Sequence, residues 1–175
     1  MQKKNLLHLF VALTVVLLYN TNVFAQSAAT ASATANVIAP ISLVKNVDMN
    51  FGNIAVSVST GGTLMLAPGG TRSTGGAGGV TLPAASGTVA AASFTVSGNA
   101  SYTYAITLPS SVTITDGASH SMTVNSFTSN PAATGTLSSG GTQNITVGAT
   151  LNIASAQTAG TYTNASGVPV TVNYN

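Results

Sequence analysis

The feature that most constrains this chain is an alternation of apolar and polar residues with a period of two, which recurs in segment after segment. Alternation at this period indicates a β-strand that buries one of its faces. The alternating segments are rich in Thr, Val, Ile and Tyr, which favour strands. Their apolar positions are Phe94 and Val96; Tyr102, Tyr104, Ile106 and Leu108; Met122 and Val124; Ile145 and Val147; Leu151 and Ile153; and Val168, Val170, Val172 and Tyr174.

Turn-forming residues separate these segments, at Asp116-Gly117, Asn130-Pro131, Gly140-Gly141 and Gly160. Beyond the first 25 residues, no stretch shows the spacing of an amphipathic helix, and no repeat of propeller or solenoid length occurs. The sequence therefore predicts an all-β fold, a single antiparallel β-sandwich over residues 40–175.

The first 25 residues have the layout of a secretory signal peptide. Lys3 and Lys4 precede an apolar run, 6–18, and Val23-Phe24-Ala25 supplies the small residues of a cleavage site. The run is shorter than the roughly 20 residues that span a bilayer. We expect cleavage between Ala25 and Gln26, and hence an exported protein that is periplasmic, cell-surface or extracellular. Its only membrane contact would be through the export signal.

Removing this segment leaves a chain with almost no charge, since only Lys45, Arg72, Asp48 and Asp116 remain. So few cations cannot neutralise the roughly six to ten phosphates that an ordinary DNA site engages, which argues against a nucleic-acid partner. The chain has no cysteine, so disulfides are excluded.

The mature chain also has few side chains that could act in catalysis, because it has no Glu and His120 is its one histidine. Asp116 and His120 flank a turn and could approach each other, but a turn-forming Asp and a solvent-facing His explain them better than a catalytic pair. Zinc and calcium sites need clustered ligands that the sequence does not offer. We therefore predict a protein that is not an enzyme, with no catalytic residues, no metal site and no cofactor.

Two segments depart from the strand pattern. Residues 59–87 are rich in Gly, Ser and Thr around Arg72 but lack the Lys of a phosphate-binding loop, so they are predicted to form a long flexible connection. Residues 26–39 alternate Ala with Thr, Ser or Asn, which indicates an extended segment with small side chains. This segment is either suited to lie between the strands of another sheet or is simply the first strand of its own domain.

Several short motifs, taken in order, resemble a family of exported bacterial proteins, domain of unknown function 4402. The resemblance spans residues 31–175 and implies an immunoglobulin-like β-sandwich, distantly similar to fimbrial and spore-coat subunit domains, with no established activity. The motifs are Pro40-Ile41-Ser42-Leu43, Phe51-Gly52-Asn53-Ile54, Phe94-Thr95-Val96-Ser97-Gly98, Tyr104-Ala105-Ile106-Thr107-Leu108-Pro109, Ile145-Thr146-Val147-Gly148-Ala149-Thr150-Leu151, Gln157, Gly160-Thr161-Tyr162 and Val170-Thr171-Val172-Asn173-Tyr174.

Pattern and resemblance together suggest a pilin-like structural or surface subunit whose partners are copies of itself or other surface subunits. The last strand, with Val168, Val170, Val172 and Tyr174, is similar to the chaperone-recognised strand of chaperone–usher pilins. The N-terminal segment, through Ala29, Ala31, Ala33, Ala35 and Val37, could complete a neighbour's sheet by strand addition.

The alternative is a monomeric extracellular module that binds a surface glycan or a protein. Glycan binding calls for exposed aromatic platforms, for which Tyr102, Tyr104 and Tyr162 are the candidates. Their place in alternating segments favours burial in the core instead.

Overall fold

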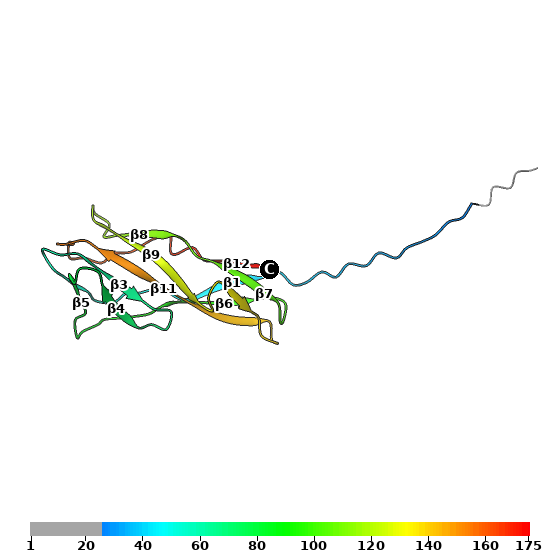
Figure 1. Ribbon diagram of the computed structural model, residues 1–175, viewed down its shortest axis with the longest axis horizontal. Helices are drawn as coiled ribbons and strands as arrows, with labels where there is room; N and C mark the ends of the chain where they lie inside the picture. The colour runs from blue at the N-terminus through cyan, green and yellow to red at the C-terminus, as the bar shows by residue number, and fades with distance from the viewer. Residues whose placement is uncertain (1–25) are drawn as a thin grey trace, which may run out of the picture. The chain divides into compact units, whose positions relative to one another are not determined.

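The computed structural model describes residues 26–175, and the predicted signal peptide, with Ala25 at its cleavage site, lies outside them. The described chain forms twelve strands and no helix, which confirms the all-β prediction (Figure 1). In this part of the chain there is thus no helix that could cross a membrane. The chain divides into Met1–Asn36 and a folded unit, Val37–Asn175.

The strands of the folded unit are short, apart from two long ones, β9 and β11. In chain order they are β1 (Ser42–Val47), β2 (Ala55–Val56), β3 (Gly62–Leu66), β4 (Arg72–Gly75), β5 (Val80–Thr81), β6 (Ala92–Ser97), β7 (Thr103–Thr107), β8 (Ser111–Thr115), β9 (Ser121–Asn130), β10 (Thr134–Thr136), β11 (Thr142–Ile153) and β12 (Thr171–Tyr174).

All strand pairs are antiparallel, and β11 is the central strand of a seven-stranded sheet. One edge of β11 pairs with β9, which in turn pairs with β8. The other edge pairs with β6 along residues 142–147 and with β3 along residues 149–153. On their far sides, β6 pairs with β1 and β3 pairs with β4. A second sheet has the order β10-β7-β12, and β2 pairs with β5.

Five alternate residues of β11 are buried, and they contribute to two clusters of the core. Ile145 and Val147 pack with residues of β6 and β7, so the two larger sheets share one cluster. Ala149, Leu151 and Ile153 pack with residues of β3, β5 and β9 in the other. The period-two pattern of this segment therefore reflects one buried face along the whole strand.

A β-bulge in β9 lets one aromatic side chain reach both clusters. The pairing of β9 with β11 shifts by one residue between Thr128 and Asn125, and Ser126 adopts a positive φ of 50° there. An extra residue in one strand reverses which side chains face inward beyond it. Phe127 consequently packs against both core clusters.

The Gly-rich range 59–87 differs from the predicted connection, because it contains the β3–β4 hairpin and the short strand β5. Leu64, Leu66 and Val80 within it are buried. The chain that leaves β3 passes close over β11, where a Cβ atom on Gly148 would collide with the backbone of Leu66 and Ala67. Few side chains in this range carry the alternation, which is why the pattern did not reveal the hairpin.

Candidate functional site

The pair formed by Asp116 and His120 closes the turn between β8 and β9. His120 Nδ1 lies 2.6 Å from Asp116 Oδ2, and the backbone N–H groups of Ala118 and His120 donate to Asp116 Oδ1. The hydrogen bond with His120, followed by the one from Ala118, lowers the pKa of the Asp116 carboxyl. The His120 side chain is 44% exposed. The Asp116 carboxylate thus binds three groups of the turn that it begins.

Arg72 holds a loop of its own domain. Its Nη1 donates to the carbonyl oxygens of Phe51 and Asn53, at 2.8 Å and 3.0 Å. Gly52 between them has a φ of 71°, and a Cβ atom there would collide with the Ser86 carbonyl. Gly52 thus allows a turn in the Phe51-Gly52-Asn53-Ile54 motif that the Arg72 guanidinium ties to β4.

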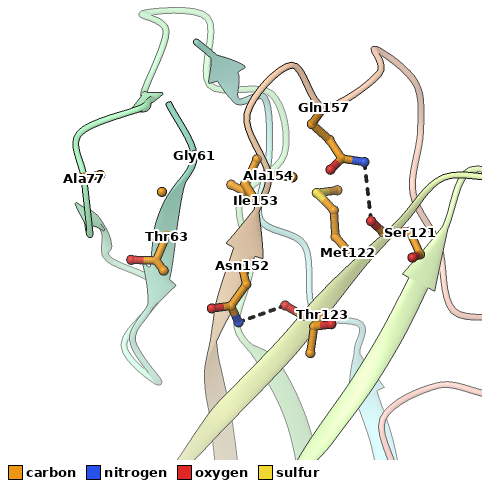
Figure 2. A pocket seen from close by; sticks show the side chains of 11 residues that line it. Gly61, Thr63, Ala77, Ser121, Met122, Thr123, Asn152, Ile153, Ala154 and Gln157 are labelled. Atoms are coloured by element: carbon orange, nitrogen blue, oxygen red, sulfur yellow. Dashed lines mark hydrogen bonds between the residues drawn. The ribbon is translucent and has the colours of Figure 1, made fainter. Parts of the chain in front are cut away.

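A shallow pocket of about 610 Å³ lies where β3, β9 and β11 meet (Figure 2). Its two amide side chains form hydrogen bonds within the chain. Asn152 donates to the Thr123 carbonyl at 3.1 Å, and Gln157 donates to the Ser121 carbonyl at 3.4 Å. No titratable side chain is among the residues that line this pocket. Within residues 26–175, no three His, Asp, Glu or Cys side chains are grouped to hold a metal ion.

The three candidate tyrosines lie in different surroundings. Tyr104 is fully buried and donates to Gln143 Oε1 at 2.6 Å, and its burial raises the pKa of the phenol. Tyr162 is half-buried and donates to the Thr158 carbonyl. Tyr102 is 40% exposed, so the prediction of burial is wrong for this residue. Its ring packs edge-on against Tyr174, with 5.7 Å between the ring centroids.

The N-terminal segment forms no strand. From Gln26 to Val37 every side chain is exposed, including those of Ala29, Ala31, Ala33 and Ala35, and Val37 is 92% exposed. The first strand of the chain begins only at Ser42.

The terminal strand shows the predicted alternation of burial. Val168, Val170, Val172 and Tyr174 are half-buried and the residues between them are exposed. The paired strand β12 begins only at Thr171, since Pro169 has no N–H group to donate to a ladder. Apart from Val168, these side chains pack against the cluster that the two larger sheets share.

Strands β1 and β12 are edges of different sheets and lie in contact with each other. Ile41 and Leu43 on one side, and Val172 and Tyr174 on the other, are half-buried and pack on the same core cluster. Tyr174 connects β12 to the chain just before β1, because its hydroxyl donates to the Ala39 carbonyl at 3.0 Å. The side of the domain between β1 and β12 therefore carries partly covered apolar side chains beside two unpaired strand edges.

Sequence reasoning missed two contributors to this region. Leu43 was named only as part of a family motif and not as a core position, because its neighbour Val44 is apolar and interrupts the alternation. The contacts of the Tyr174 hydroxyl with Ala39 and Asn99 join residues far apart in the sequence, and no local signal reports them.

Comparison with known proteins identifies a family for almost the whole folded unit. No curated protein and no solved structure gives a significant match. The model of the family described as domain of unknown function (DUF4402) matches residues 41–174, from just before β1 to the end of β12. This chain therefore belongs to the DUF4402 family.

Proposed function

We propose that the protein is an exported, non-enzymatic structural or surface subunit that assembles by β-strand addition. In this process the N-terminal segment of one subunit completes a sheet of another. The segment and the incomplete sheet belong to every copy, so the contact can repeat from subunit to subunit and build a polymer.

The observation that carries this proposal is the exposed, unpaired segment at residues 26–37 in a chain that also has unpaired sheet edges. An unpaired edge presents a row of N–H and C=O groups and is a template for another strand. The alternating Ala and Thr side chains of the segment give it one small apolar face and one polar face, which suits a strand at the boundary of a core.

Deleting residues 26–38 tests the proposal. The chain 26–175 is expected to form multimers, and the chain 39–175 is expected to remain monomeric and to unfold more easily. Light scattering after gel filtration gives the molar mass, and thermal unfolding gives the stability. If both chains are monomeric and equally stable, assembly by strand addition is wrong.

A monomeric module that binds a surface glycan is the second candidate, favoured by one observation, the exposed Tyr102 ring against Tyr174. Aromatic rings at a surface offer an apolar platform for the faces of sugars. A glycan array probed with the chain 26–175 and with Tyr102→Ala separates this function from assembly, because a structural subunit should give no signal that depends on Tyr102.

A further inference from the structure

Most strand edges of the folded unit are blocked against a second chain. The edge of β8 is covered, since Thr115 pairs with Thr163 and Asn164 donates to the Thr113 carbonyl. The three-residue strand β10 has its Thr136 N–H bound by the Gln143 side chain. Strand β4 begins with the charged Arg72 and ends at Gly75. Short strands, charges and covered backbone groups are the usual protections of sheet edges.

The edge of β1 is also protected. Lys45 lies on it, with its ammonium 2.6 Å from Asp48 Oδ1. The register of β1 against β6 is broken by a bulge between Lys45 and Val47. An edge lysine and a bulge both oppose the addition of a further strand, so β1 is a poor acceptor.

Strand β12 is also short, with four residues, but it carries neither a charged residue nor a bulge. The sequence Val168–Tyr174 has no charge and no glycine, and the register of β12 against β7 runs without a shift. The partners of β7 are β10 and β12, so β12 is the last strand of its sheet. Pro169 precedes the paired part of the strand and does not interrupt it.

The backbone groups of β12 that are available can be assigned from the ladder. Opposed residues of an antiparallel pair alternate between exchanging hydrogen bonds and not exchanging them. Asn175 N donates to the Thr103 carbonyl, so Asn173 and Thr171 also exchange bonds with β7. Val172 and Tyr174 therefore direct their N–H and C=O groups away from β7. Their side chains face the core and are only half-buried.

The small side chains of the N-terminal segment fit beside this edge. Because β1 and β12 already contact each other, a strand added to β12 has little room for large side chains on its inner face. Ala29, Ala31, Ala33 and Ala35 would supply such a face, with Val37 at its end. The residues between them, Thr30, Ser32, Thr34 and Asn36, are polar and would face water.

The donor belongs to a second copy because the chain before β1 is poorly suited to reverse direction. Residues 26–40 contain no glycine, and Pro40 holds Ala39 in an extended conformation. A return of the segment onto its own β12 would need a tight turn in Val37–Pro40. The Ala39 carbonyl is, in addition, bound by Tyr174.

Resting on the proposed function, we infer that the acceptor of strand addition is the free edge of β12, and that its occupant is the segment 29–37 of another copy. The Ala face of the donor covers Val172 and Tyr174, and its Thr face lies with Asn173 on the outside of the sheet.

Engineered cysteines test this assignment, since the native chain has none. Asn173→Cys places a thiol on the outer face of β12, at a residue whose backbone bonds go to β7. Such a residue would form a close, non-hydrogen-bonded pair with the added strand, which suits a disulfide. In the chain 26–175, Asn173→Cys is combined with one further substitution at a time: Ser32→Cys, Thr34→Cys, Ala31→Cys or Ala33→Cys. The matched control carries Val44→Cys on the exposed face of β1 in place of Asn173→Cys.

After mild oxidation, non-reducing gels should show covalent multimers with position 32 or 34. Their yield should be about tenfold above that with 31 or 33, since only thiols on one face meet the separation that a disulfide requires. If the control with Val44→Cys forms the covalent multimers instead, the β12 assignment is wrong although strand addition still holds. The same follows if Asn173→Cys links equally well to positions 31 or 33 and to positions 32 or 34. A disulfide within one chain would overturn the second copy as the donor. If multimers form but none becomes covalent, β12 is not the acceptor. A chain that is monomeric with and without residues 26–38 would instead refute the proposed function itself.

Discussion

At the scale of single residues, each of the four charged side chains in residues 26–175 has a partner close by. Lys45 pairs with Asp48, Arg72 binds two backbone carbonyls, and Asp116 lies against His120. The pairs are local, so the described surface presents little net charge to an ionic ligand. The few charged side chains of the described part thus all make contacts within the chain.

The Asp116 turn should make stability depend on pH in the acid range. Its pKa is lowered in the folded state by His120 and Ala118, so the carboxylate stabilises the fold fully above the ordinary Asp pKa, about 4. This contribution is lost as the pH falls through the lowered pKa of the folded state. We expect Asp116→Asn to be less stable than the native chain at neutral pH and to lose less stability on acidification. Urea unfolding between pH 2 and pH 7, roughly the range in which a carboxyl titrates, measures this. Asp48→Asn, at an exposed carboxyl, is the control, and an equal acid response in the native chain and Asp116→Asn would contradict the role of Asp116.

Gly148 provides a second test at a single residue. An added Cβ atom would meet the backbone of Leu66, Ala67 and Pro68, which cannot move as a flexible side chain can. We expect Gly148→Ala to lower the free energy of unfolding by about 3 kcal/mol, a typical cost of overpacking a tight contact. Gly69→Ala is the matched control, because no atom lies within 4 Å of a Cβ at that position. Similar denaturant midpoints for the two variants would mean that the chain does not pass closely over β11 there.

At the scale of strands, sequence reasoning was accurate where side chains alternate and turns are marked. The buried Phe94 and Val96 of β6, the buried face of β11 and the Gly117 turn, with its φ of 78°, were all predictable for this reason. The β3–β4 hairpin was not, because Gly, Ser and Thr there give no periodic signal. The bulge at Ser126 escaped as well, since any small residue can occupy it and only the register with β11 reveals it. The alternation in the sequence predicted the extended segment 29–37 and the terminal strand. It could not predict that β12 has a free edge, because this depends on the order of the strands in the sheet.

The bulge in β9 can be tested by substitutions at Ser126. A φ of 50° suits glycine, is tolerated by serine and is strained for a β-branched side chain. We expect Ser126→Gly to be close to neutral and Ser126→Val to lose about 2 kcal/mol of unfolding free energy. Chemical denaturation of both variants checks this. If valine is tolerated as well as glycine, the bulge is not at Ser126 and Phe127 does not join the two core clusters in this way.

At the scale of the whole protein, a nearly neutral surface and an unprotected edge both favour association. Net charge far from zero keeps proteins apart, and the chain 26–175 is formally neutral, with two cations and two anions. Exposed strand edges are normally shielded, and the folded unit shields most of its edges but not β12. An unprotected edge in a protein with little repulsive charge is consistent with the proposed strand addition.

The molar mass of the chain 26–175, measured by light scattering with and without a synthetic peptide of residues 26–40, tests the central claim of strand addition most directly. The account predicts multimers that the peptide converts into monomers, each with one bound peptide. A peptide with Ala33→Pro should be inactive, because proline at that position breaks the backbone ladder. Multimers unaffected by the native peptide, or a chain that is monomeric without it, would contradict the account.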